Sequence, residues 1–144
     1  MEMIERLYDE AAEAGIRVCC GDLPIDGMNA AYVKTESDKK LIYMQRDGTQ
    51  AERTCWMAEE LGHHETGDDR VLRYDTVADW KAEAKARRWA HDRLLSRDSI
   101  LTAAQNTDDI YEIAFTLGVS VVFLREAIDD LMARGLWATA NDLG

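Results

Sequence analysis

The sequence predicts a single α+β domain with an N-terminal helix, a small antiparallel sheet and a helical C-terminal half. The chain has 144 residues, enough for one sizeable hydrophobic core. Hydrophobic residues make up 47% of it and charged residues 31%, a balance that favours a globular chain over a disordered one. Strand and helix patterns occur in separate blocks, without the alternation that predicts a parallel sheet.

The first third of the chain carries one helical pattern and then short strand patterns. Apolar residues recur at helical spacing from Ile4 to Ala12, and Gly15 stands where such a helix would end. Three β-rich runs follow, separated by turn residues, at residues 16–20, 30–34 and 40–44. These runs predict the three strands of the sheet.

The rest of the chain has helical patterns. Thr49 and Glu52 have the spacing of a capping box, so a helix begins there and runs to about residue 64. Thr76 followed by Asp79 predicts a second helix, which runs to about residue 95. Three shorter helices are predicted after it, at residues 98–105, 108–117 and 121–134. We therefore describe residues 1–144 as one domain, with a core at 1–97 and a helical tail at 98–144 packed on it.

The charge of the chain disfavours two classes of partner. Seventeen Lys and Arg residues oppose 28 Asp and Glu residues, and a net charge of -11 repels nucleic acids and anionic membranes. No apolar run approaches the ~20 residues of a membrane span, and the N-terminus lacks the pattern of a secretory signal. Three cysteines without CxxC spacing argue against a disulfide framework. We expect a cytoplasmic protein that binds no nucleic acid directly and no membrane.

The stretch at residues 58–64 carries the candidate chemistry. On a helix, Glu59 and His63 lie one turn apart on the same face and can bind one metal ion. Glu60 is rotated to one side, where it can act as general base on a water molecule, as in the zincin motif H-E-x-x-H. Here Glu59 replaces the first His of that motif. The alternative is a solvated acidic helix face, balanced by the basic residues of the next helix.

A metal site of this kind needs a third protein ligand, and Glu83 is the candidate. Alanine recurs every four residues from Ala82 to Ala90, which forms a flat stripe on which another helix can approach closely. Glu83 stands beside this stripe, so close approach of the two helices would bring it over Glu59 and His63. Asp79 is the competing ligand. The purely structural alternative for Glu83 is a salt bridge to the arginine four residues further on.

At these two segments together the sequence resembles the ImmA/IrrE family of metallopeptidases, in particular the short prophage and mobile-element members. The family pattern is a helix with H-E-L-G-H-H, then a second helix with E-x-x-A-x-x-[FW]-A before a Leu-Leu pair. Here the first segment reads EELGHH at 59–64, and the second reads EAKARRWA at 83–90, before a Leu-Leu pair. Cys55 and Ala58 also match the prophage members, and looser similarity covers nearly the whole chain.

The resemblance implies a zinc-dependent endopeptidase. Carried over by position, Glu59, His63 and Glu83 would be the metal ligands and Glu60 the general base. Family members of this kind cleave a partner transcription factor, often a phage or element repressor encoded beside them. The resemblance therefore implies a helix-turn-helix repressor as the protein substrate.

Three positions qualify this interpretation. Glu59 departs from the family's His, and a site of two carboxylates and one imidazole tolerates Mn or Fe better than the usual zinc site. The alternative function is therefore an inactive or metal-poor relative that binds the repressor without cutting it. We interpret His64 as a core or supporting group, because it is rotated away from the metal face, with a metal ligand as the alternative. We interpret His91 as a surface residue, with a substitute ligand as the alternative.

The pattern of residues 110–130 is similar to that of a helix-turn-helix, with Gly118 and Ser120 at the turn. Within 108–130, six acidic residues oppose Arg125 alone, whereas a recognition helix needs basic residues to contact phosphates. We interpret this helical pair as a packing element that does not bind DNA. Docking of the repressor is its second predicted role.

Overall fold

The computed structural model describes residues 2–23, 27–67 and 77–137, so residues 68–75, between the two predicted motif helices, lie outside it. An N-terminal helix, a small sheet and five further helices follow one another, which confirms the α+β class. The elements are α1 (Met3–Glu13), β1 (Ile16–Gly21), β2 (Ala30–Lys34), β3 (Lys40–Gln45), α2 (Gln50–Glu65), α3 (Val77–Leu94), α4 (Arg97–Ala103), α5 (Ile110–Leu117) and α6 (Val121–Ala133).

The three strands form one mixed sheet in the order β1-β3-β2. β2 pairs antiparallel with β3, with Tyr32 opposite Ile42. β1 pairs parallel with β3, with Val18 opposite Ile42, so the predicted antiparallel arrangement is wrong for this pair of strands. The physical reason is that the alternation of apolar residues determines which face of a strand is buried. It does not determine whether the strand runs parallel or antiparallel to its neighbour.

Capping interactions define the start and end of several helices. At the start of α2, the Thr49 hydroxyl accepts a hydrogen bond from the Glu52 N–H, and the Glu52 carboxylate accepts one from the Thr49 N–H. This is the predicted capping box. α5 ends at Gly118, whose φ of 73° is the left-handed conformation that glycine adopts at low cost. The cap predicted at Thr76 lies outside the described residues.

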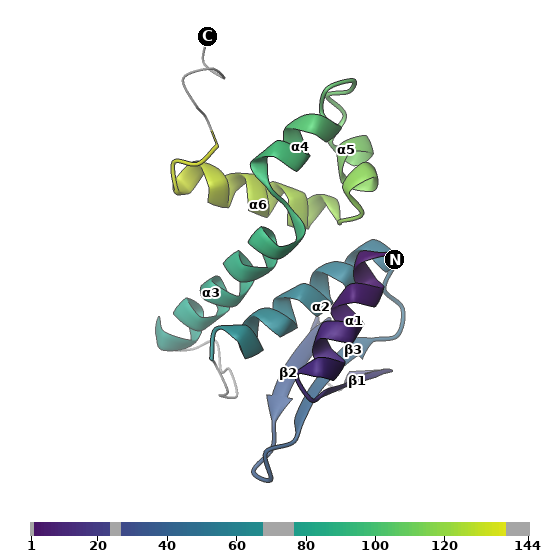
Figure 1. The fold of residues 1–144 in the computed structure, drawn as a ribbon, viewed down its shortest axis with the longest axis vertical. Coiled ribbons are helices and arrows are strands. Elements are labelled where there is room, and N and C mark those ends of the chain that lie inside the picture. The colour runs from purple at the N-terminus through teal and green to yellow at the C-terminus, as the bar shows by residue number, and fades with distance from the viewer. Residues whose placement is uncertain (1, 24–26, 68–76, 138–144) are drawn as a thin grey trace.

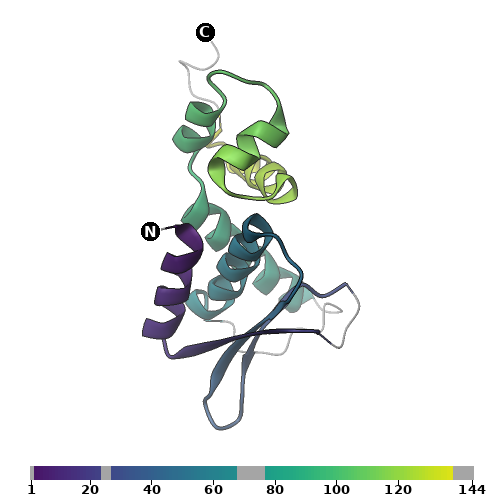
Figure 2. The ribbon, with the colours of Figure 1, turned by 90° about the vertical axis from the view of Figure 1, so that its right-hand side faces the viewer.

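The sheet and α1 lie at one end of the molecule and α4, α5 and α6 at the other, with α2 and α3 between them (Figures 1 and 2). α2 and α3 make the most extensive contact between two elements of the described chain. α6 packs on α3. No helix within the described ranges is long and apolar enough to span a membrane.

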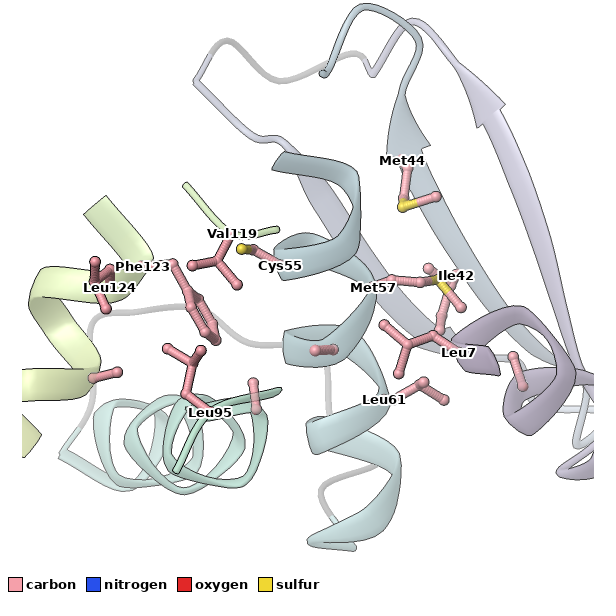
Figure 3. Packing of buried hydrophobic residues seen from close by; sticks show 14 of the residues in the cluster. Leu7, Ile42, Met44, Cys55, Met57, Leu61, Leu95, Val119, Phe123 and Leu124 are labelled. Carbon is pink, nitrogen blue, oxygen red and sulfur yellow. The ribbon is translucent and has the colours of Figure 1, made fainter. Parts of the chain in front are cut away.

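α2 lies at the centre of the hydrophobic core and is buried on two sides (Figure 3). On one side Met57 lies toward Ile42 of β3 and Leu7 of α1. On the other side Cys55 lies beside Val119, with Phe123 of α6 beyond it. A helix that is buried on two sides keeps its carboxylates partly away from water, and this affects the chemistry of the acidic residues that it carries.

Candidate metal centre

α2 and α3 approach closely at Gly62 and Ala86. A Cβ added to Gly62 would overlap the carbonyl oxygen of Ala86 and would lie 3.0 Å from its carbonyl carbon and its Cα. The alanines that face this contact are buried, with Ala86 and Ala90 fully so and Ala82 8% exposed. The small-residue stripe predicted from the sequence is therefore the surface on which the two helices meet.

This crossing brings His63 and Glu83 together. His63 Nε2 lies 3.0 Å from Glu83 Oε2, and His63 is only 4% exposed. Arg87 Nη2 lies 3.5 Å from the other carboxylate oxygen, Glu83 Oε1. The predicted approach of Glu83 to His63 and its alternative salt bridge to Arg87 are therefore both present. Each uses a different oxygen of the Glu83 carboxylate.

Glu83 has an acceptor atom that no hydrogen bond satisfies. Close contact with His63 holds the pKa of Glu83 below its usual value, against the effect of burial and with help from Arg87. Glu83 Oε2 is nevertheless buried without a hydrogen bond of ordinary geometry from the described residues. An imidazole nitrogen and a carboxylate oxygen at this separation are two atoms that could both bind one cation.

Glu59 and Glu60 lie in a desolvated and negatively charged region. Burial raises the pKa of Glu59 to about 7; Arg87 opposes this effect, while Glu126 and Glu83 add to it. Burial also raises the pKa of Glu60 to about 7. His63 opposes this rise, and the carboxylates of Glu83 and Glu59 add to it. A carboxyl group with a pKa near 7 can both accept and release a proton at neutral pH.

The strand β2 supplies contacts to this region that the sequence did not predict. The backbone N–H of Tyr32 donates to the Glu60 carboxylate. The Tyr32 hydroxyl lies 3.1 Å from His64 Nδ1, and the two rings pack edge to face with centroids 5.8 Å apart. His64 therefore contacts β2, and its supporting role stays a prediction. No motif marks Tyr32, because its contact with Glu60 uses a backbone group that every residue but proline has, and its contact with His64 depends on how β2 packs against α2.

The described residues include no group of three His, Cys, Asp or Glu side chains that could hold a metal ion as they are placed. Their donor set still fits a divalent cation on two grounds. Glu83 Oε2 is an unsatisfied buried acceptor, and the carboxylates of Glu59 and Glu60 have raised pKa values that a cation would relieve. Glu59 as the third ligand stays a prediction, and the side chain of Asp79 lies outside the described part of the chain.

His91 is not a surface residue, so its predicted location is wrong. It is 5% exposed, its Nδ1 lies 3.4 Å from Asp130 Oδ2, and its ring packs edge to face on Phe123 of α6. Burial lowers the pKa of His91, although Asp130 opposes this effect. The burial of His91 could not be predicted from the sequence of α3, because the residues that bury it belong to α6.

The fold and the crossing of α2 and α3 define the class. A small α+β domain that brings His63 of one helix to Glu83 of the next, beside the pair Glu59 and Glu60, is a metallopeptidase-like domain. The family model described as the IrrE N-terminal-like domain of the M78 peptidases matches residues 11–129, and the chain belongs to this family. The resemblance seen in the motifs is thereby confirmed, and the function of the family is metallopeptidase-like. Comparisons with curated proteins and with solved structures gave no significant match.

Proposed function

We propose that this chain is a zinc-dependent endopeptidase of the cytoplasm that hydrolyses a specific peptide bond in a helix-turn-helix repressor. The observation that carries the proposal is the 3.0 Å approach of His63 to Glu83 across the helix crossing. Glu59, one turn before His63, completes the proposed ligand set. Manganese and iron are alternatives to zinc, because two of the three ligands are carboxylates.

Glu60 is the proposed general base. A divalent ion held by Glu59, His63 and Glu83 would polarise the scissile carbonyl and acidify water. Glu60 takes a proton from the attacking water as the oxygen bonds to the carbonyl carbon, and passes it to the amine nitrogen as the C–N bond breaks. The N–H of Tyr32 holds the Glu60 carboxylate in place for both transfers.

The edge of the sheet supports a peptide as the substrate. β2 is an edge strand of the described sheet, and its residue Tyr32 contacts Glu60 through the backbone. An edge strand offers backbone N–H and C=O groups with which an extended peptide can pair. A peptide bound along β2 would therefore pass close to the proposed general base.

The replacement of the family's His by Glu59 favours a second candidate function. A site with one more carboxylate holds zinc less selectively, and a metal-poor relative would act as a repressor-binding protein without hydrolysis. Substitution Glu60→Gln separates the two functions. It abolishes cleavage by a peptidase and leaves the affinity of a pure binding protein for the repressor unchanged.

Metal content and cleavage together test the proposal. Elemental mass spectrometry of the purified chain after incubation with zinc should find about one ion per chain, and Glu59→Ala and Glu83→Ala should lose it. The zinc-loaded chain should cut a purified helix-turn-helix repressor encoded beside it at one position, as measured by mass spectrometry of the products. Glu60→Gln should retain the metal and lose cleavage. A chain that binds no zinc, or whose Glu60→Gln variant still cuts, would contradict the proposal.

A further inference from the structure

α5 and the start of α6 expose large apolar side chains. Tyr111 is 66% exposed, Phe115 88% and Val122 66%. Tyr111 and Phe115 are four residues apart on α5 and so share one face, and Val122 follows across the three-residue turn to α6. We call these three residues the α5–α6 apolar patch. Exposed aromatic side chains that cluster in this way are typical of protein–protein contact sites.

An open groove lies between α4 and α5, next to the patch. Its volume is about 620 Å³, and it is lined by Asp98, Thr102, Asn106, Glu112 and Thr116 among others. Glu112 directly follows Tyr111 in the sequence, and Thr116 directly follows Phe115. The face of α5 that lines the groove is therefore next to the face that carries the two aromatic residues of the α5–α6 apolar patch. A segment that lies across α5 can therefore contact both.

The charge around the patch is predominantly negative, since Arg125 is the one basic residue within α5 and α6. Among the described residues, Asp108, Glu112 and Asp129 have no Lys, Arg or His within ion-pair distance, and all three are exposed. A second copy of the chain would place the same acidic groups against each other across a two-fold axis. Nucleic acid would bring further negative charge. The partner that complements both the apolar patch and its charges is a protein segment with apolar and basic side chains.

We propose that the α5–α6 apolar patch and the adjoining groove are a docking site for a basic, amphipathic segment of another protein. Its apolar side chains would pack on Phe115 and Tyr111, and its lysines or arginines would pair with Glu112 and Asp108. This inference goes beyond the proposed function and does not depend on hydrolysis, because it concerns a surface remote from Glu60.

The patch is fixed relative to the α2–α3 crossing. α6 contacts α3 through Asp130, which lies 3.2 Å from Arg88 and 3.4 Å from His91. Arg87 of α3 in turn lies 4.0 Å from Glu126 of α6. A partner docked on α5 and α6 is therefore held in a defined position with respect to the candidate metal centre.

The test uses the full chain with Glu60→Gln, so that no peptide can be cut during the measurement. The probe is a fluorescein-labelled peptide of about 14 residues, with leucines and lysines at helical spacing. Its Kd is measured by fluorescence anisotropy at physiological salt. The double substitution Tyr111→Ser and Phe115→Ser should weaken binding about tenfold, and Glu112→Gln about threefold.

Met132→Ser is the matched control. Met132 is 53% exposed on α6 but lies ten residues beyond Val122, about 15 Å along the helix. The control should bind the probe within about twofold of the parent chain. Because all the substituted side chains are exposed, thermal melting followed by circular dichroism should show every variant folded.

Three outcomes would overturn the proposal. The Tyr111 and Phe115 double variant binds the peptide as tightly as the parent chain does. Met132→Ser weakens binding as much as the double variant does, which would mean that the peptide binds exposed apolar side chains of the chain without preference for the patch. The parent chain sediments as a dimer and the double variant as a monomer, which would make the patch a contact between copies. Amide shifts confined to α4, α5 and the start of α6 on addition of the peptide would support the proposal.

Discussion

The carbonyl of Ala86 in α3 occupies the space that a side chain on Gly62 of α2 would need. This contact sets the distance between the two helices and thereby the 3.0 Å separation of His63 Nε2 and Glu83 Oε2. Gly62 stands between the glutamates at 59 and 60 and the histidines of the motif, in a helix interior where glycine is otherwise unfavourable. Its presence there is explained by the close crossing.

The substitution Gly62→Ala should destabilise the protein. In an ordinary helix interior alanine is more stable than glycine by about 0.5–1 kcal/mol, but here its Cβ would force α2 and α3 apart. We expect the free energy of unfolding to fall by about 1–3 kcal/mol in urea denaturation. Gly21→Ala is the control, because a Cβ there meets nothing within 4 Å. A stabilised Gly62→Ala variant would show that the helices are not in backbone contact.

The metal-free protein should lose stability as the pH rises toward 7. The pKa of Glu60 is raised from 4.5 to about 7, so the folded state holds more protons than the unfolded state between these values. Glu59 behaves in the same way. The free energy of unfolding in chelator should therefore fall by roughly 1–3 kcal/mol between pH 5 and 7.5. Glu83 does not contribute to this pH dependence, because its pKa is lowered. The stability that Glu83 provides is lost only at pH values below this range, as its carboxylate becomes protonated.

Two substitutions test whether Glu60 causes this pH dependence of the free energy of unfolding. Glu60→Gln should reduce the slope and make the chelated protein more stable than the wild type at pH 7.5. Glu65→Gln, at the exposed end of α2, should keep the wild-type slope. An unchanged slope in Glu60→Gln would mean that this carboxyl group titrates normally.

Zinc should oppose the effect of pH, because a cation stabilises the charged carboxylates. Saturation at about 100 times the Kd should add about 2.7 kcal/mol to the free energy of unfolding. Differential scanning fluorimetry in zinc and in chelator measures this gain as a shift of Tm. Glu83→Gln should abolish most of the shift, whereas Glu65→Gln should retain it. Equal zinc shifts in the two variants would exclude Glu83 as a ligand.

Asp130 should contribute strongly to the contact between α6 and α3. Burial raises its pKa, but the hydrogen bond with His91 and the charges of Arg134 and Arg88 outweigh burial and lower it. Its stabilising effect is therefore present above the usual carboxyl range and lost as the pH falls through the lowered pKa. At pH 7, Asp130→Asn should cost about 1–3 kcal/mol in urea denaturation.

The neighbouring exposed acid provides the comparison for Asp130. Asp129→Asn changes the same charge on the same helix, but the side chain faces solvent. It should alter the free energy of unfolding by no more than about 0.5 kcal/mol. Equal effects of the two substitutions would mean that the contacts of Asp130 contribute nothing beyond net charge.

The sequence predicted those features that depend on short-range spacing. The capping box at Thr49 and the end of α5 at Gly118 follow from residues within one or two helical turns, and the approach of Glu83 to His63 was inferred from the alanine spacing within α3. Features that depend on distant segments were missed. The parallel pairing of β1 depends on how the chain passes around β3, and the burial of His91 depends on Phe123 and on α6.

The position of α2 between the sheet and α6 limits how this domain can change over evolutionary time. A helix with two buried faces has to suit two neighbours at once, so an exchange of the C-terminal tail between related chains also replaces the side chains that pack on one of these faces. Phe123, which lies beyond Val119 on this side of α2, would have to come with a neighbour that fits it. Specificity for new partners can therefore be acquired most readily on the outer surface of α5, where side chains are free to vary without any change in the core.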